Sequence, residues 1–446
     1  MPEVKKVSVL CSDHNLESET NALSKAIIIG AGPAGVAAAI RLTKHNNISC
    51  TVYELRPVPT TLGGAVGIPS NGLRLFDRLG LYKALSTKGS ESSNVRIHFA
   101  QGGGLVEADA VPKEAREKTG HSYMRIKRVE LMDVLLTAAS EMNIPIHYGK
   151  KMVDITEDED TKSITVTFSD GTSDTADLLL GCDGIHSAVR TQYVDPSCQP
   201  QYSGVSGTCV MFPTSAISAE SFESLQAINV SFTTEGAIAL VPCTATGDEI
   251  FFVFSRKVPI PESGDTRDGW EEHRKKEVDS FKNLLLDGAL KSVRGQWGEV
   301  LTQAVKSTSS VSFYPIFRLP LGGKWFRGSR CLLMGDAAHA MQPHAGQGVS
   351  MAMEDVFLLS RLLKDRESSL TEVFEKFNRV RRPRINKIYE IAAHNGERRI
   401  QTSPWALWAR EWAMWAGILA MRVVGKQQTL ISDPEDLLYD IDAVDI

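Results

Sequence analysis

AIIIGAGPAG, residues 26–35, places a short β-branched run directly before a glycine-rich turn. The run 26–29 has the continuous apolar character of a strand buried on both faces of a parallel sheet. Helix-forming residues 36–42 follow, and a second apolar run, 48–53, ends in Glu54. Strand, glycines, helix, strand and terminal acid stand in the order of a dinucleotide-binding fold. The sequence therefore predicts a Rossmann-like α/β domain.

The glycines and the acid have separate physical roles in such a fold. Gly30 permits the tight turn, Gly32 lets the backbone approach a pyrophosphate, and Gly35 lets the helix lie close to the strand. Glu54 is expected to accept hydrogen bonds from a ribose diol. Because its carboxylate would repel an extra phosphate on that ribose, this site is not expected to hold NADP. A further glycine-rich stretch, LGGAVGIP at 62–69, would let a planar ring lie against the backbone, and an ordinary flexible loop is the alternative.

A second stretch, GDAAHAMQPHAGQGVSMAMED at 335–355, repeats this local design. It follows the apolar run 331–334 and leads into the helical pattern 356–363, so a strand delivers Asp336 to a loop that opens a helix. Backbone N–H groups and the positive end of the helix dipole then point at one spot. That spot suits an anionic or electron-rich ligand.

A third strand-to-helix transition lies between these two. The apolar run 178–180 leads into GCDGIHSAVR at 181–190, where Asp183 and Gly184 form the turn. Arg190 follows this turn by about two helical turns and is the candidate catalytic residue of this motif. The alternative is that Arg190 pairs with an acid or a cofactor phosphate.

A chain of 446 residues exceeds the usual single core, so two intertwined domains are predicted. Alternating segments near 95–107 predict a hairpin, and 191–314 is mostly β with a charged helical insertion. The predicted parts are an N-terminal extension (1–24), a dinucleotide-binding domain (25–86, 120–190 and 315–370), a mostly antiparallel β domain (87–119 and 191–314) and C-terminal helices (371–446).

Composition argues against several classes of function. A net charge of −5 with dispersed Lys and Arg does not predict nucleic-acid binding. Seven cysteines, never spaced as CxxC, fit neither a disulfide framework nor a zinc site, and no metal site is predicted. Acidic residues near the N-terminus disfavour a secretory signal and a mitochondrial presequence, so a cytoplasmic location is expected.

Four tryptophans mark the C-terminal region. Trp405, Trp408, Trp412 and Trp415 are spaced so that they share one helix face. Packing against the protein's own core is the favoured interpretation; a dimer contact, a lid over the pocket and an interfacial membrane helix are the alternatives. The apolar run is too short to cross a bilayer, so no transmembrane segment is predicted. The oligomeric state is not predicted.

Taken in order, the three motifs resemble those of single-component FAD-dependent aromatic monooxygenases of the p-hydroxybenzoate hydroxylase and salicylate hydroxylase type. The resemblance extends over residues 25 to about 365. It implies the p-hydroxybenzoate hydroxylase fold, in which an FAD-binding domain is intertwined with a β-rich substrate domain. Arg128 matches the family's arginine near the FAD, although a solvated arginine at a helix start is the alternative. Ser350 stands where many members carry Asn.

The resemblance also implies which residues hold FAD. These are Gly30, Gly32, Gly35 and Glu54 for the ADP half, Arg128, Asp183 and Gly184 beside it, and Asp336, Pro343, Gly346, Gln347, Gly348 and Val349 for the flavin half. His339 and His344 flank the residues implied to contact the flavin ring, and a structural hydrogen-bonding role is expected for both.

The implied activity is hydroxylation or epoxidation of an aromatic or polycyclic small molecule, with dioxygen and with NADPH or NADH as reductant. It would proceed through a flavin C4a-hydroperoxide, which water decomposes, so a dry pocket under the β domain is expected. In such a site Arg190 would hold a phenolate or polarise the peroxide. Two alternatives remain: an FAD-dependent reductase or dehydrogenase without oxygen insertion, and a non-catalytic carrier built on the same fold.

Overall fold

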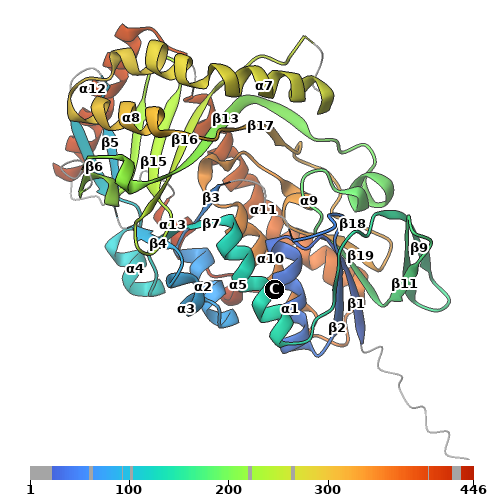
Figure 1. The fold of residues 1–446 in the computed structure, drawn as a ribbon. Helices are drawn as coiled ribbons and strands as arrows, with labels where there is room; N and C mark the ends of the chain where they lie inside the picture. The colour runs from blue at the N-terminus through green and yellow to red at the C-terminus, as the bar shows by residue number, and fades with distance from the viewer. Residues whose placement is uncertain are drawn as a thin grey trace, which may run out of the picture.

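The computed structural model describes residues 23–59, 64–92, 94–100, 104–218, 223–262, 267–399, 401–423 and 433–446. The predicted N-terminal extension lies outside the described residues except at its last two positions. A six-stranded sheet occupies one half of the molecule and a seven-stranded sheet the other, and helices cover both (Figure 1). The predicted α/β class is confirmed.

The six-stranded sheet is parallel except at one edge. Its strands in spatial order are β18 (Phe326–Arg327), β19 (Cys331–Leu333), β12 (Leu178–Gly181), β1 (Lys25–Ile29), β2 (Ser49–Tyr53) and β8 (Ile146–His147). Only β18 runs antiparallel to its neighbour. The central strands β1 and β12 are almost entirely buried, which explains why their sequences are apolar throughout.

Helices and a small sheet cover the six-stranded sheet. Helix α1 (Pro33–Asn46) packs against α5 (Arg128–Glu141) and α10 (Gly348–Leu362). A three-stranded antiparallel sheet, β9 (Met152–Asp158), β10 (Ser163–Phe168) and β11 (Ser173–Ala176), contributes Ile164 and Val166 to the same core. The segment 144–168 thus forms three strands, β8, β9 and β10.

The seven-stranded sheet is antiparallel apart from the pair β14–β5. Its strands in spatial order are β17 (Ser312–Arg318), β13 (Gln201–Pro213), β16 (Glu249–Lys257), β15 (Ala237–Pro242), β14 (Ile228–Phe232), β5 (Asn94–His98) and β6 (Leu105–Asp109). Helices α7 (Arg267–Asn283) and α8 (Gly295–Ser307) lie over its outer face (Figure 1), where Phe252 and Phe254 pack in one cluster with Phe281. Its other face is therefore turned toward the rest of the chain.

A second small sheet lies between the two large ones (Figure 1). Its order is β3 (Ala65–Ile68), β7 (Tyr123–Lys127) and β4 (Ser90–Ser92). The flexible-loop interpretation of residues 62–69 is wrong for 65–68, which form β3, while residues 60–63 lie outside the described part. The short helices beside it are α2 (Ser70–Leu79), α3 (Tyr82–Ser86) and α4 (Lys113–Thr119).

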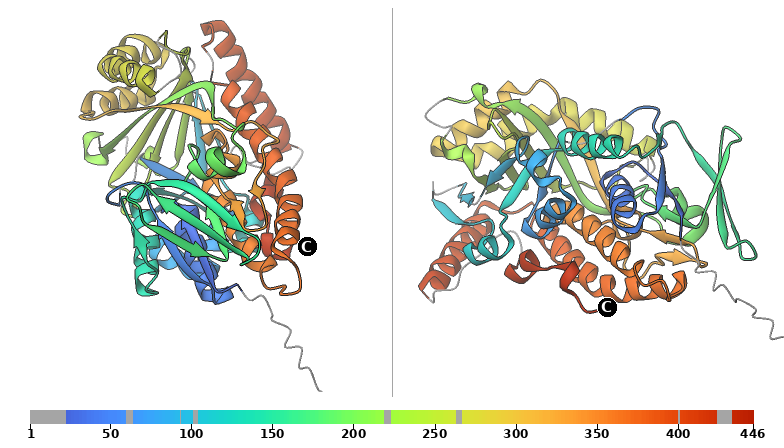
Figure 2. Two further views of the ribbon diagram at one scale, coloured as in Figure 1. Left: turned by 90° about the vertical axis from the view of Figure 1, so that its right-hand side faces the viewer. Right: turned by 90° about the horizontal axis from the view of Figure 1, so that it is seen from below.

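The C-terminal part is helical, as predicted. Its helices are α11 (Leu370–Glu397), α12 (Pro404–Val423) and α13 (Pro434–Leu438). Helix α11 begins at a capping box, in which the Ser369 side chain accepts from the Glu372 N–H and Glu372 accepts from the Ser369 N–H. In Figure 2 the orange to red helices run along one side of the molecule. Within the described part of the chain, no helix is long and apolar enough to cross a membrane.

The tryptophan face of α12 points away from the core, so the favoured interpretation was wrong. The exposed fractions are 74% for Trp405, 46% for Trp408, 52% for Trp412 and 42% for Trp415. The buried residues Leu407, Glu411 and Ile418 lie on a different face of the helix. The periodicity correctly indicated one shared face, but it did not indicate which way that face points.

A buried ion cluster joins α10 to α11. Arg381, which has no exposed surface, donates from Nη1 to Glu354 Oε2 (2.6 Å) and from Nε to Asp355 Oδ1 (2.7 Å). Arg384 adds a second guanidinium to Glu354. Burial alone would raise the pKa of Asp355, but the charges of His339 and Arg381 outweigh it and the pKa is lowered. The carboxylate therefore stays ionised inside the core.

Replacing Arg381 by Met leaves two buried carboxylates without their main partner. We expect the free energy of unfolding to fall by about 3–5 kcal/mol, measured by denaturant titration. Arg379→Met, on the exposed face of the same helix, is the matched control and should change it by less than about 0.5 kcal/mol. Equal effects of the two substitutions would contradict a structural role for the cluster.

Candidate functional site

The three sequence motifs meet at one edge of the six-stranded sheet. Strands β19, β12, β1 and β2 are adjacent and parallel, so their carboxyl ends lie together. In that spatial order the strands lead to Asp336, Asp183, Gly30 and Glu54. Residues far apart in the sequence thus share one site.

The first glycine-rich turn is tightly packed at Gly30 and Gly35 and open at Gly32. At Gly30, where φ is +105°, an added Cβ would lie 2.5 Å from the carbonyl oxygen of Cys182, which belongs to the motif at 181–190. At Gly35 it would lie 2.0 Å from the carbonyl oxygen of Gly30. At Gly32, the N-cap of α1, an added Cβ would have no atom of the other described residues within 4 Å, apart from its two chain neighbours. The uncapped N-terminus of α1 therefore faces free space, which suits a phosphate.

Two carboxylates border this turn. Glu54 accepts from the Ala31 N–H (2.9 Å) and from the Arg56 N–H (3.0 Å), so it is fixed beside the turn. Asp183 accepts from the Ala188 N–H through Oδ2 (2.6 Å), whereas its buried Oδ1 has no partner among the described residues. Burial raises the pKa of Asp183 despite these hydrogen bonds. The unpartnered oxygen is a place for a ligand to bind.

The motif at 335–355, third in chain order, contributes the loop from Gly335 to Gln347, which we name the flavin loop. Asp336 starts the short helix α9 (Asp336–His339) and is exposed. Gly348 and Val349 begin α10, whose N-cap, Gln347, gives no side-chain cap. The far end of the loop is held by Asn71, whose Nδ2 donates to Gln347 Oε1 (3.0 Å) and to Glu354 Oε1 (2.9 Å).

Of the two histidines of the flavin loop, His339 makes the expected side-chain hydrogen bond, whereas the buried Nε2 of His344 has no partner among the described residues. His339 Nε2 lies 2.7 Å from Asp355 Oδ2 in the buried cluster. His344 follows the exposed Pro343, and burial together with the charge of Arg399 lowers the pKa of its imidazole to about 2. It is therefore neutral at any working pH.

Ser350 is buried against helix α2. Its Oγ has no partner among the described residues, and a Cβ added at Gly72 would lie 2.2 Å from it. An asparagine at position 350 would collide with α2 at this spacing. The serine is therefore matched to a glycine in the neighbouring helix.

Arg190 lies inside the protein rather than over an open site. It is 1% exposed, and its guanidinium donates to three backbone carbonyls: Cys198 (3.0 Å), Ala337 (2.8 Å) and Ile185 (2.5 Å). These bonds join the second motif to the flavin loop. We therefore replace the catalytic hypothesis for Arg190 with a positioning role.

Gly184, at φ +79°, lies in the turn that precedes Arg190. Arg128 is the exposed first residue of α5, and its N–H donates to the Gly64 carbonyl (3.0 Å).

Sequence reasoning missed the residues that hold the loop from other elements. Tyr123 of β7 is one: its hydroxyl would lie 1.8 Å from a Cβ added at Gly67 and 3.3 Å from one added at Gly346. Asn71 and Arg381 are others. The alternation of Tyr123-Met124-Arg125-Ile126-Lys127 was a usable signal for a half-buried strand. Nothing in the sequence connects Asn71 or Arg381 with the flavin loop.

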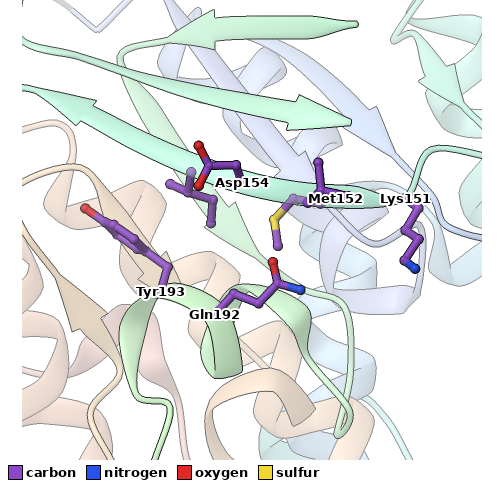
Figure 3. Close-up of a pocket in the computed structure, with 7 residues that line it drawn as sticks. Lys151, Met152, Asp154, Gln192 and Tyr193 are labelled. Carbon is purple, nitrogen blue, oxygen red and sulfur yellow. The ribbon is translucent and has the colours of Figure 1, made fainter. Parts of the chain in front are cut away.

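A surface pocket of about 480 Å³ lies away from this site, between β9 and the π-helical turn η1 (Arg190–Val194). In Figure 3, Gln192 and Tyr193 face Met152 and Asp154 across it. It contains none of the predicted site residues. We therefore do not treat it as the functional site.

Comparison with known proteins agrees with this geometry. The family described as FAD binding domain matches residues 24–283 and 321–392. A 6-hydroxynicotinate 3-monooxygenase of Pseudomonas fluorescens is 28% identical over 383 residues, which are 84% of this chain and 92% of that protein. A salicylate hydroxylase of Pseudomonas putida is 26% identical over 393 residues, 83% of this chain and 85% of that protein.

The fold is shared with a solved salicylate hydroxylase in a substrate complex. The TM-score is 0.71 at 22% identity, and the match covers 95% of this chain and 97% of that one. The family match, more than half of the residues, agrees with the meeting of all three motifs at one sheet edge. The chain belongs to the FAD-binding domain family.

Proposed function

We propose that this chain is an FAD-dependent monooxygenase that uses NADPH or NADH and dioxygen to insert one oxygen atom into an aromatic small molecule. The observation that carries the proposal is the convergence of the three motifs at one sheet edge, in a chain whose relatives of similar length are named as monooxygenases. Bound FAD supplies the redox chemistry, taking up hydride and transferring oxygen. The residues of the chain bind it, orient it and exclude water.

The ADP half of FAD fits the first turn. Open space at Gly32, before the N-terminus of a 14-residue helix, suits the pyrophosphate. Glu54, fixed by two backbone N–H groups, keeps lone pairs for a ribose diol. The unpartnered Oδ1 of Asp183 is free for a donor on the cofactor.

The flavin half fits the third motif. Exposed Asp336 is able to accept from ribitol hydroxyls, and the uncapped N-terminus at Gly348 is able to stabilise negative charge on a reduced ring. Gly346 lies against the Tyr123 hydroxyl, so the loop is supported from behind.

Water exclusion is supported by the inner face of the seven-stranded sheet. Cys209, Met211, Phe251 and Val253 form an apolar cluster there with Ala65 of β3. Burial raises the pKa of Cys209 to about 12. That thiol therefore stays protonated and uncharged, and the cover adds no ionised group to the site.

A matched pair of glycine substitutions separates cofactor binding from folding. Gly32→Ala adds a Cβ to open space, so the FAD-free protein should keep its stability within about 1 kcal/mol. Its FAD dissociation constant should rise about tenfold or more, because the phosphate contact is displaced. Gly35→Ala should lower the free energy of unfolding by roughly 3 kcal/mol, because the added carbon overlaps the Gly30 carbonyl. Unchanged FAD affinity in Gly32→Ala would count against the phosphate site.

Asp336→Ala should weaken FAD binding about tenfold or more, because a charge-assisted hydrogen bond is lost. The measurement is the ratio of flavin absorbance to protein after gel filtration. Asp154→Ala, in the surface pocket of Figure 3, is the control and should keep its flavin. Full flavin retention in Asp336→Ala would argue against its role.

Oxygen insertion itself is tested with isotopically labelled dioxygen. A panel of aromatic acids and phenols is incubated with the holoenzyme and NADPH or NADH, and reductant consumption and product mass are followed together. We expect a fitting substrate to accelerate reductant oxidation and to gain one labelled oxygen. Reductant oxidation that yields only hydrogen peroxide would show uncoupling without oxygen insertion. A substrate converted to a product without label would instead indicate a reductase.

A further inference from the structure

Strand β7 has one face in the core and one face toward the seven-stranded sheet. Met124 and Ile126 are fully buried in the main core. Their neighbours alternate to the other face, where Tyr123 packs in one cluster with Val241 of β15. On that same face, Lys127 Nζ lies 2.5 Å from Glu249 Oε2, at the start of β16. Arg125, between Tyr123 and Lys127, therefore also faces the seven-stranded sheet.

Arg125 differs from Lys127 in its partners. Lys127 is neutralised by Glu249 and lies 3.9 Å from a Glu130 oxygen. Among the described residues, no carboxylate lies within 4.0 Å of the Arg125 guanidinium, and its buried Nε has no hydrogen-bond acceptor. The ring centroid of Tyr123 lies 5.8 Å away. A cation that is partly removed from water without an acid is costly unless a ligand completes it.

The position of Arg125 connects it with the flavin loop. In the β3–β7 register it lies opposite Gly67, and the Tyr123 hydroxyl is packed between Gly67 and Gly346 of the loop. Its charge also acts on two thiols of the facing sheet. Burial raises the pKa values of Cys209 and Cys243 to about 12. Nearby positive charges partly oppose this, with Arg128 ahead of Arg125 at Cys209 and Lys127 ahead of Arg125 at Cys243. Arg125 thus lies near the thiols of the facing sheet, and its neighbour Tyr123 packs against Gly346 of the flavin loop.

We propose that Arg125 is the anion-binding residue of the substrate site and receives a carboxylate or phenolate oxygen of the aromatic substrate. A guanidinium offers a planar pair of N–H donors, which matches a carboxylate in a bidentate pair and a phenolate through one donor. The thiols Cys209 and Cys243 are uncharged, and Lys127 is paired with Glu249. On β7, Arg125 is therefore the partner for the negative charge of the substrate. This inference rests on the proposed function, because it assigns part of the same site.

The test uses the FAD-loaded enzyme and three small probes. Salicylate carries a carboxylate, salicylamide replaces it by a neutral amide of the same shape, and para-nitrophenolate carries charge on the phenol oxygen alone. Binding is followed by the change in flavin absorbance, which does not require turnover. Arg125→Gln removes the charge, Arg125→Lys keeps it without the planar donor pair, and Arg366→Gln, at an exposed position, is the control.

We expect Arg125→Gln to raise the salicylate dissociation constant at least about tenfold, with salicylamide changed less than about twofold and Arg125→Lys in between. A loss confined to para-nitrophenolate would equally support the anion site and would assign the phenolate as its source. Equal losses for salicylate and salicylamide would overturn the inference, as would a wild-type enzyme that binds neither anion.

The same variant separates this inference from the proposed function. Loss of FAD from Arg125→Gln, in proportion to the loss of salicylate, would mean that the arginine serves the cofactor. That result would overturn the anion site and leave the monooxygenase proposal intact. A wild-type protein that binds no FAD would instead overturn the proposed function itself.

Discussion

One buried carboxylate fixes the shape of the flavin loop. Asp355 has no exposed surface, and its oxygens accept from the Gly335 N–H (2.9 Å) and from Arg381 Nε (2.7 Å) and lie 2.7 Å from His339 Nε2. These partners come from the start of the loop, from α9 and from α11. Glu354, the preceding residue, reaches the far end of the loop through Asn71. The loop is thus held at both ends by buried polar contacts within the chain.

The parts of this site that follow from local geometry were predictable from sequence. A β-branched run followed by glycines predicts a buried parallel strand and a tight turn, and the contact between Gly35 and the Gly30 carbonyl is the close approach that requires a glycine. The glycine-rich stretch at 62–69 was expected to let a planar ring lie against the backbone. Gly64 and Gly67 do accommodate flat rings, but these are the chain's own Phe251 and Tyr123.

What the sequence did not predict depends on contacts between distant segments. The spacing of Arg190 indicated a residue near the second turn, but its guanidinium ends on the carbonyl of Ala337, far along the chain. A charged residue in a motif gives no information about whether its charge faces a ligand or the backbone. The tryptophans of α12 show the same limit, because periodicity defines a face and tertiary packing decides which face is buried.

Burial explains why a charge for the substrate belongs on β7. Strands β1 and β12 are covered on both faces, so an unpaired cation on either would be dehydrated without compensation. The inner face of the seven-stranded sheet must stay apolar to exclude water from the site. Strand β7 has a core face that anchors it, through Met124 and Ile126, and a second face between the two large sheets. On this strand Arg125 faces the seven-stranded sheet next to Tyr123, which packs against the flavin loop, and it is still able to meet a ligand.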